Sequence, residues 1–331
     1  MDCLIDSYHR RINYLRLSLT DRCNLRCRYC MPPEGVTKFG HEEILRYEEI
    51  LRFVRLAVRK GIQKIRLTGG EPLVRKGILP FIRELSALPG IQDLSLTTNG
   101  LLLPELADPL RKAGLKRVNI SMDSLHPEKY REITGGGNLS QVWAGIEAAK
   151  SVGMSPIKIN VVAIAGFNDK EIFDFAALTM NHPFQVRFIE FMPFGGFWEW
   201  KKESWISCDE IQRRIEARVP LIPAEQTKNS HDGPARLFRF PQAKGEIGFI
   251  SPISNHFCDS CNRLRLTADG KLRTCLFAEE EIDIRELLRQ DCSDRLLEAI
   301  LEEAILRKPL RRRMIEGSIK SCSRPMVQIG G

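Results

Sequence analysis

A regular alternation of strand-like and helix-like segments constrains the fold of this chain more than any other feature of its sequence. The predicted strands cover residues 14–19, 64–67, 93–96, 117–122, 157–164 and 185–191. The predicted helices between them cover residues 46–60, 78–87, 105–113, 140–151 and 169–180. Segments of these lengths suit parallel strands joined by crossover helices. We therefore predict an α/β fold in which six βα units curl into a partial (βα)6 barrel of the TIM type.

The alternation ends near Pro193, and the sequence beyond it has a different organisation. It predicts a helix over 209–218, short strands over 236–240 and 247–250, and helices over 283–290 and 293–307. We therefore predict two parts, the barrel over residues 1–193 and a C-terminal segment over residues 194–331.

Composition and charge limit the classes of partner. The N-terminus, MDCLIDSYHRR, has no apolar core of signal-peptide length, and no later run approaches the roughly 18 apolar residues of a membrane span. We therefore expect a cytoplasmic protein without a membrane partner. The formal net charge of +8 suits an anionic small molecule as well as nucleic acid. Because no aromatic-plus-basic recognition motif is present, we expect no nucleic-acid partner.

Ten cysteines in a reducing compartment are typical of metal binding rather than of a disulfide framework. Six of them form two tight groups, Cys23, Cys27 and Cys30 in the first and Cys258, Cys261 and Cys275 in the second. The other four are scattered, and we expect buried or incidental thiols at Cys3, Cys208, Cys292 and Cys322.

The first cysteine group has the spacing C-x3-C-x2-C and follows the first predicted strand. A structural zinc site takes four tetrahedral ligands, so this group is one ligand short. A 4Fe-4S cluster held by three thiolates instead keeps its fourth iron free for a non-protein ligand. The missing fourth cysteine therefore favours a cluster, with zinc as the alternative.

The zinc alternative is stronger for the second group, because C-x2-C is the commonest zinc half-site and His256 could serve as a fourth ligand. Between its cysteines, the segment Asn262–Leu266 alternates like a strand and places Arg263 and Arg265 on one face. Two guanidinium groups beside a cluster form an anion site suited to phosphates. Two solvated arginines are the plain structural alternative.

Polar residues recur at the carboxyl ends of the predicted strands. They are Thr68 to Pro72 (TGGEP), Thr97 to Gly100 (TTNG), Ser121 to Asp123, and Glu190 with Met192, while the fifth strand carries Lys158 and Asn160. In parallel βα folds these ends meet at one edge, so we expect the side chains to share a cavity. Arg16, Arg66 and Lys158 could add positive charge inside the barrel. Each residue alone also fits a turn, core packing or a solvated charge.

Four stretches of the sequence together resemble one enzyme family. They are YLRLSLTDRCNLRCRYCMP, KIRLTGGEPLVRK, CDSCNRLRLTADGKLRTCL and the terminal GG. The first two resemble the radical S-adenosylmethionine (SAM) superfamily. The whole set resembles the GTP 3′,8-cyclase family, also called molybdenum cofactor biosynthesis protein A. The resemblance implies a radical SAM barrel, a C-terminal segment with a second 4Fe-4S cluster, SAM as cofactor and GTP as substrate.

The resemblance also implies roles for individual residues. The first cluster would be bound by Cys23, Cys27 and Cys30, and the second by Cys258, Cys261 and Cys275. SAM contacts would fall on Tyr29, Gly70, Ser121 and Met192. GTP contacts would fall on Arg16, Arg66, Thr97, Lys158, Arg263, Leu264 and Arg265, with Thr98 as a chemical equivalent of Thr97. The catalytic residues would be Arg263, Arg265, Gly330 and Gly331, the last two in a tail that either reaches the active site or frays.

In the reaction that the resemblance implies, a radical removes hydrogen from ribose C3′ of GTP, C3′ attacks guanine C8, and reduction gives (8S)-3′,8-cyclo-7,8-dihydro-GTP. This is the first step of molybdenum cofactor (molybdopterin) biosynthesis, and cyclic pyranopterin monophosphate synthase acts next. The expected partners are an external electron donor of the flavodoxin or ferredoxin type and a second copy in a homodimer. Two alternatives stay open, a radical SAM enzyme that modifies peptides with an auxiliary cluster and a zinc-stabilised binding module.

Overall fold

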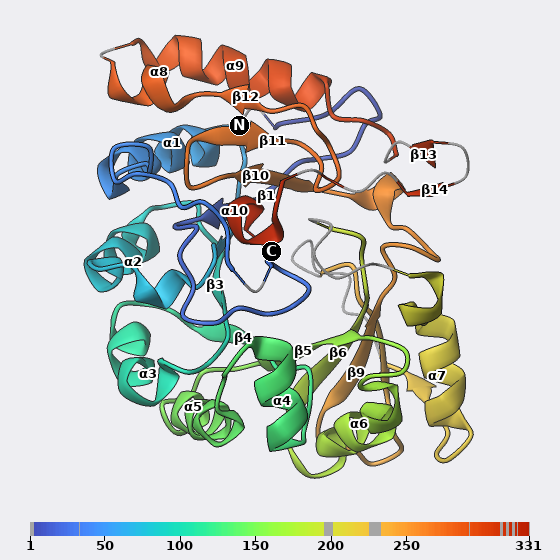
Figure 1. Cartoon of the computed structure of the whole chain (residues 1–331). Coiled ribbons are helices and arrows are strands. Elements are labelled where there is room, and N and C mark those ends of the chain that lie inside the picture. Colours follow the sequence, from blue (N-terminus) through green and yellow to red (C-terminus); the bar gives the residue numbers. More distant parts are fainter. Residues whose placement is uncertain are drawn as a thin grey trace.

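The computed structural model has one large sheet at its centre (Figure 1). It describes residues 3–32, 34–194, 201–224, 233–290, 292–311, 314–315, 318–319, 322 and 324–330. The central strands are β1 (Tyr14–Ser18), β2 (Lys64–Thr68), β3 (Asp93–Thr98), β4 (Arg117–Ser121), β5 (Ile157–Ala163) and β6 (Phe184–Glu190). They lie in sequence order, and each is parallel to the next. The predicted (βα)6 arrangement is confirmed.

Helices on the outside of these strands follow the predicted ranges closely. They are α1 (Tyr47–Arg59), α2 (Ile78–Ala87), α3 (Leu103–Lys112), α5 (Leu139–Ser151) and α6 (Ile172–Asn181). In α1 the apolar residues Ile50, Val54 and Ala57 lie on the buried face. At its start, the Arg46 backbone N–H donates to the Glu49 side chain at 2.6 Å, which satisfies one donor that the helix leaves unpaired.

One barrel helix, α4 (Pro127–Thr134), is missing from the sequence prediction. Its buried residues are only Tyr130, Ile133 and Thr134. An apolar repeat this short spans little more than one turn, so the helix signal is weak, although Pro127 lies at the first helical position and Gly135 at the C-cap. The helix matters because its end supports the site described below.

Strands from the C-terminal part of the chain extend both edges of the sheet. β10 (Arg263–Leu266) pairs parallel with β1, and β9 (Glu246–Ile250) pairs parallel with β6. Beyond β10 lie β11 (Lys271–Arg273) and β12 (Ile282–Asp283), and beyond β9 lie β8 (Arg236–Arg239) and β7 (Ile222–Pro223). One sheet therefore contains strands from both sides of residue 193. The division of the chain into two parts at this residue stays a prediction.

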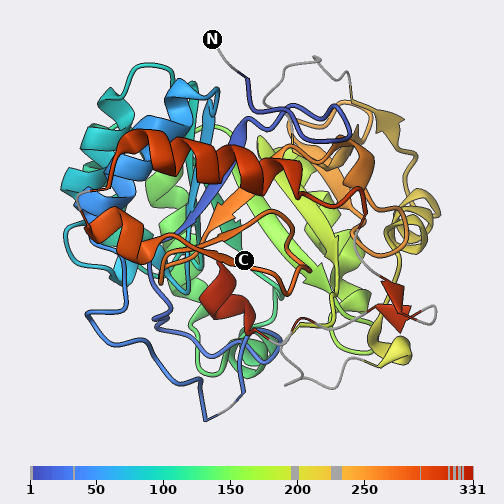
Figure 2. The same ribbon diagram turned by 90° about the horizontal axis from the view of Figure 1, so that it is seen from above.

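The remaining elements pack around the sheet. α7 (Cys208–Glu216) contacts α6 and β9, while α8 (Arg285–Arg289) and α9 (Asp294–Leu306) contact α1. The strand pair β13 (Met314–Ile315) and β14 (Ser318–Ile319) and the short helix α10 (Met326–Ile329) follow. Figures 1 and 2 both show α10 and the C-terminal end near the middle of the molecule. None of the helices described is long and apolar enough to cross a membrane.

Side chains alternate along the strands, so one face packs on the helices and the other points into the barrel. On β5, Ile157 and Ile159 are buried in the hydrophobic core, while Lys158 between them is half-buried. The register pairs Arg16 with Arg66 on one side and with Arg265 on the other. The strands therefore place three arginines side by side inside the barrel.

Candidate active site

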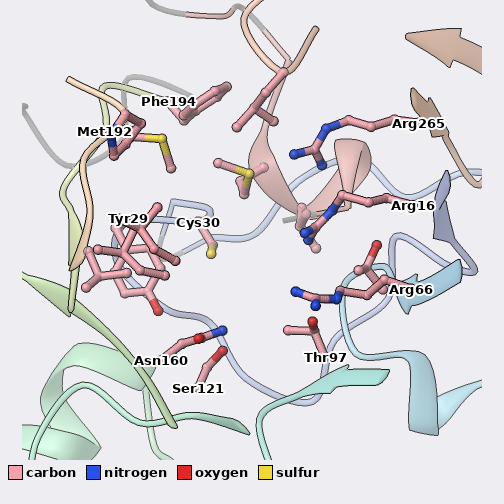
Figure 3. A pocket seen from close by; sticks show the side chains of 18 of the residues that line it. Arg16, Tyr29, Cys30, Arg66, Thr97, Ser121, Asn160, Met192, Phe194 and Arg265 are labelled. Atoms are coloured by element: carbon pink, nitrogen blue, oxygen red, sulfur yellow. The ribbon is translucent and has the colours of Figure 1, made fainter. Parts of the chain in front are cut away.

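A cavity of about 330 Å³ lies at the carboxyl ends of the parallel strands, and both cysteine groups line it in full. The other predicted residues in its lining are Arg16, Tyr29, Arg66, Gly70, Thr97, Ser121, Met192, Arg263 and Arg265. Figure 3 shows Arg16, Arg66 and Arg265 along one wall, with Tyr29 and Met192 on the opposite wall. The fold thus gathers into one cavity residues that are far apart in the sequence.

Three of the predicted residues that the structure describes are not part of this lining, and a fourth cannot be placed. Lys158 lies deeper in β5 than the residues that reach the cavity. Leu264 is fully buried in the hydrophobic core, so only its backbone can meet a ligand. Gly330 is buried, and its carbonyl accepts a hydrogen bond from Arg265 Nη1 at 2.6 Å. Gly331 lies outside the described residues.

The first cysteine group lies in the loop that follows β1, and the end of α4 supports this loop. Arg26 N–H donates to Thr134 O, and Arg28 N–H donates to Ile133 O, both at 2.9 Å. These two backbone hydrogen bonds flank Cys27. The helix that sequence reasoning misses is therefore a direct support of the cysteine loop.

Burial raises the pKa of all three thiols in this loop. For Cys23 the pKa rises to about 11, and the charge of Glu71 adds to the effect of burial. For Cys27 and Cys30, burial acts together with the neighbouring thiols and the charge of Asp123. Because metals bind the thiolate, this group needs a positively charged partner to hold it deprotonated. The irons of a 4Fe-4S cluster would supply that charge, and three soft thiolates fit such a cluster.

Two glycines follow β2 beside the cysteine loop. Gly70 N–H donates to Thr20 O at 2.6 Å. A Cβ on Gly70 would lie 2.3 Å from Arg22 O, so no other residue fits where the two backbones meet. The next residue, Glu71, is buried and accepts a hydrogen bond from Asn99 N–H at 2.7 Å. Glu71 thereby joins the segment after β2 to the segment after β3.

Two buried carboxyl groups flank the first cysteine group. Tyr29 donates from its hydroxyl to Asp123 Oδ2 at 2.6 Å, and Asp123 Oδ1 accepts from Val162 N–H at 2.8 Å. Burial raises the pKa of Asp123 to about 6 and that of Glu71 to about 7. We call this part of the cavity the first-cysteine side and define it by Cys23, Cys27, Cys30, Glu71 and Asp123.

A buried cation accompanies the second cysteine group. Lys308 is 2% exposed and donates from Nζ to Arg263 O at 3.0 Å and to Thr274 O. Burial by itself would raise the pKa of the Cys261 thiol, but the charges of Lys308 and Arg263 bring the pKa below its ordinary value. A thiolate at Cys261 therefore has protein cations beside it, and Cys261, Cys258 and Cys275 again form a three-thiolate donor set suited to a 4Fe-4S cluster.

Two further residues hold the segment that leads to Cys258. Arg10 Nη1 donates to Cys258 O at 2.6 Å. The fully buried Glu190 accepts from Ile253 N–H at 2.8 Å. His256, in the same segment, also lines the cavity.

Within the part of the chain that the structure describes, no three His, Cys, Asp or Glu side chains converge at the spacing of a single metal ion. The cysteines of a 4Fe-4S cluster each bind a different iron. Such a cluster therefore does not require the three thiols to converge on one point.

The arginine side of the cavity is defined by Arg16, Arg66, Arg187, Arg263 and Arg265, together with the second cysteine group and the buried Lys308 beside it. Tyr14 is buried among these cations, with Arg66 Cζ 5.5 Å from the centre of its ring. Burial would raise the pKa of Tyr14, but the charges of Arg66 and Arg16 lower it to about 7. Burial, chiefly, lowers the pKa of Arg66 itself to about 10. Positive charges held this close together favour binding of a polyanion.

Two buried polar atoms in the cavity wall also point to a ligand. Among the residues described, the buried lining atoms without a hydrogen-bond partner include Thr97 Oγ1 and Asn160 Oδ1. Thr98, in contrast, donates to Glu71 Oε1 at 2.9 Å and accepts from Gly100 N–H at 3.0 Å. Because buried polar groups are normally paired, the geometry favours Thr97 over Thr98 as a ligand contact.

Comparison with known proteins agrees with this geometry. A family model described as the Radical SAM superfamily matches residues 17–179, and one described as Molybdenum Cofactor Synthesis C matches residues 184–314. A GTP 3′,8-cyclase of Alkaliphilus metalliredigens (strain QYMF) is 49% identical over 98% of this chain and 99% of its own length. One of Alkaliphilus oremlandii (strain OhILAs) is 51% identical over the same shares. This chain belongs to the GTP 3′,8-cyclase family.

A solved structure is similar to this GTP 3′,8-cyclase family member in fold. SuiB of Streptococcus suis has a TM-score of 0.63 at 15% sequence identity, over 92% of this chain and 68% of that one. At this identity the likeness concerns the fold alone. Together with the superfamily match, it confirms the radical SAM barrel predicted from the cysteine loop and the GGEP segment.

Sequence reasoning missed three cations that this member of the GTP 3′,8-cyclase family brings to the site. The sequence could have indicated Arg187, because it lies two residues after Gln185 on β6, and residues two apart on a strand point to the same face, here the inward one. Lys308 had none, since it begins the basic run KPLRRR, which is typical of a solvated tail. Arg10 acts through a backbone carbonyl, and such contacts leave no pattern in the sequence.

Proposed function

We propose that this chain catalyses the radical SAM cyclisation of GTP to (8S)-3′,8-cyclo-7,8-dihydro-GTP, the first step of molybdenum cofactor biosynthesis. The observation that carries the proposal is the single cavity onto which both cysteine groups and the arginine side open. A cavity with one acidic and one basic side suits two ligands of opposite charge. A sulfonium cofactor and a triphosphate substrate are such a pair.

On the first-cysteine side, Cys23, Cys27 and Cys30 would hold a 4Fe-4S cluster, and SAM would contact Tyr29, Gly70, Ser121 and Met192. When bound and reduced, the cluster with SAM supplies a 5′-deoxyadenosyl radical. The residues of the chain contribute position and charge. Asp123 accepts the hydrogen bond of the Tyr29 hydroxyl and would supply negative charge to a bound sulfonium.

On the arginine side, Cys258, Cys261 and Cys275 would hold the second cluster, whose open iron would meet the guanine. The triphosphate would bind Arg16, Arg66, Arg263 and Arg265, with further GTP contacts from Thr97, Lys158 and the backbone of Leu264. Guanidinium groups bind phosphate oxygens in pairs. Holding GTP at both ends would keep ribose C3′ near guanine C8, which an intramolecular ring closure requires.

The proposal extends to the terminal glycines, the partners and the domains. Gly330 and Gly331 would act beside the substrate, since Gly330 contacts Arg265. We expect a cytoplasmic homodimer that receives electrons from a flavodoxin or ferredoxin and passes its product to cyclic pyranopterin monophosphate synthase. We also retain the division at residue 193 into a barrel and a C-terminal segment.

Anaerobic incubation with reductant, SAM and one nucleoside triphosphate at a time tests this function. Reconstituted protein should contain about eight irons per chain. It should form 5′-deoxyadenosine faster with GTP than with ATP, CTP or UTP, together with an equal amount of cyclised nucleotide. Equal 5′-deoxyadenosine formation with GTP and ATP would overturn the substrate. Stoichiometric zinc after reconstitution with iron and sulfide would overturn the cluster assignment and favour a zinc-stabilised module.

A further inference from the structure

The C-terminal residues 324–330, called here the tail, form part of the cavity wall. Met326 and Val327 line the cavity, and Gly330 is buried (Figures 1 and 2 show α10 near the middle of the molecule). Gly330 has a φ of +87°, and a Cβ there would lie 2.6 Å from Thr68 Oγ1. The position therefore requires glycine. A terminal segment seated this tightly needs an anchor, because chain ends otherwise fray.

Arg324, at the start of the tail, provides an anchor of two ion pairs. Its Nη1 donates to Glu281 Oε1 at 2.9 Å and to Oε2 at 2.7 Å, and its Nη2 donates to Asp269 Oδ1. The side chains of Arg324 and Asp269 are only 13% and 8% exposed, so water screens this pair less than an ordinary surface pair. The guanidinium also lies 5.5 Å from the centre of the Phe39 ring. Three separate segments thus hold one side chain.

Arg273 ties the same anchor to the second cysteine group. It is buried, donates to Glu281, and lies two residues before Cys275. Arg273 Nη2 is also 3.4 Å from the Sγ of Cys322, a buried residue that forms a parallel bridge with Phe194. Glu281 therefore joins the tail, through two arginines, to the segment that carries a predicted cluster ligand.

The tail contacts both sides of the cavity. Gln328 Nε2 donates to Thr37 O at 3.1 Å, in the segment that follows the first cysteine loop. Val327 Cγ2 would lie 3.0 Å from a Cβ on Gly70, so it packs close to the GGEP segment. On the arginine side, Arg265 Nη1 holds the Gly330 carbonyl at 2.6 Å. A shift of the tail would therefore disturb both sides together.

We propose that Arg324 is a positioning residue, which pairs with Asp269 and Glu281 together and so seats the tail across the cavity with Gly330 against Arg265. The contacts described above are enough to support the position of the tail. Its effect on catalysis rests on the proposed function. Without the anchor, the tail leaves the cavity more often, Arg265 loses its backbone partner, and water enters beside the substrate.

Arg324→Met tests the seating, because methionine keeps the aliphatic stem and removes both ion pairs. Hydrogen exchange on the reconstituted protein, read by mass spectrometry, should quicken about tenfold at the amides of Gln328, Ile329 and Gly330. Arg324→Lys keeps the charge and should restore part of the protection. Arg307→Met removes an exposed ion pair at the end of α9 and should leave the tail unchanged.

Turnover tests the positioning role. With SAM, reductant and GTP, Arg324→Met should still form 5′-deoxyadenosine and keep both clusters, but make about tenfold less cyclised nucleotide per 5′-deoxyadenosine. An unchanged rate of hydrogen exchange at the tail would overturn the proposed seating. An unchanged ratio of cyclised nucleotide to 5′-deoxyadenosine would overturn the role in catalysis. If the natural chain itself cyclises no GTP, the proposed function fails and the exchange measurement alone decides the role of Arg324.

Asp269→Asn is the milder variant in case Arg324→Met does not fold. It removes one carboxylate charge but keeps an oxygen for the hydrogen bond from Thr267 Oγ1, which is 2.7 Å in length. Exchange at the tail should quicken by a smaller factor than in Arg324→Met. Exchange at the natural rate in this variant would also overturn the proposal.

Discussion

The two sides of the cavity place the same kind of ligand, a group of three cysteines, in opposite electrostatic surroundings. On the first-cysteine side, the charges of Glu71 and Asp123 add to burial and raise the pKa of the thiols. On the arginine side, the charges of Lys308 and Arg263 lower the pKa of Cys261 despite its burial. Cysteine spacing alone therefore does not describe these groups, because the neighbouring charges raise the thiol pKa in the first group and lower that of Cys261 in the second.

Removal of each cysteine group is the strongest way to break this comparison. With Cys23, Cys27 and Cys30 replaced by alanine, we expect no 5′-deoxyadenosine, since no open iron remains for SAM. With Cys258, Cys261 and Cys275 replaced, we expect 5′-deoxyadenosine to form but GTP binding and cyclisation to be lost. Iron analysis should give about four irons per chain in each variant. Loss of 5′-deoxyadenosine in both variants would mean that the two sides do not have separate tasks.

Lys308→Met removes a buried cation from the arginine side alone. The carbonyls of Arg263 and Thr274 lose their charged donor, so the free energy of unfolding should fall by about 3 kcal/mol. The midpoint potential of the second cluster should become more negative, while that of the first stays unchanged, because local charge tunes such potentials. Denaturant unfolding and potentiometry followed by electron paramagnetic resonance measure the two effects. Lys150→Met on the exposed face of α5 is the control.

A potential that shifts equally at both clusters in Lys308→Met would contradict a local role for this cation. A stability loss as large in Lys150→Met as in Lys308→Met would show that the measurement does not report the buried site.

Asp123→Asn sharpens the comparison from the other side, since it removes a charge and little volume. The amide can still accept from Val162 N–H. We expect the dissociation constant of SAM to rise about tenfold, or about 1.4 kcal/mol, with that of GTP unchanged. Because the pKa of Asp123 is about 6, the natural chain should lose more SAM affinity than the variant as the pH falls through 6, while Glu71, whose pKa is about 7, titrates in both. Anaerobic calorimetry between pH 5 and 8 checks both, and parallel pH profiles would contradict the assignment.

Lys158→Met should give the smallest effect on stability. It tests the barrel interior below the cavity, where Lys158 lies on β5. Burial and the charge of Arg187 lower the pKa of Lys158 to about 6, so at pH 7 the unfolded state binds more protons there than the folded state. The contribution of Lys158 to stability must then rise with pH until the pH passes the unfolded value of 10.5. The variant should gain about 3 °C in Tm at pH 7 and nothing near pH 10.5, at some cost in GTP affinity. A lower Tm of the variant at both pH values would contradict this sign.

The barrel could be predicted because each unit carries its own local signals. The prediction for residues 78–87 coincides with α2, and the helix predicted over 105–113 is observed at Leu103–Lys112. The pairing of β10 with β1 and of β9 with β6 could not be predicted. Strands of four or five residues show an alternation but do not specify a distant partner.

The site divides in the same way. Cysteine spacing and residues at strand ends follow from local sequence and barrel geometry, so the sequence could predict that these residues share a cavity, and they line one. Their roles stay a prediction. Arg10, Lys308 and Arg324 act on backbone carbonyls or on carboxylates from remote segments. Because these contacts depend on how the segments meet in space, the sequence shows only solvated-looking basic residues at these positions.

The pairing of β1 with β10 has a consequence for synthesis of the chain. Tyr14 is in register with Arg263, which follows it by 249 residues. At a translation rate of about 5–20 residues per second, β10 is synthesised about 12–50 s after β1, so one edge of β1 has no strand partner during that time. An uncovered parallel strand edge can pair with a wrong partner during that time. The cysteine loop directly after β1 is accessible in the same interval, before the later part of the chain closes the cavity over it.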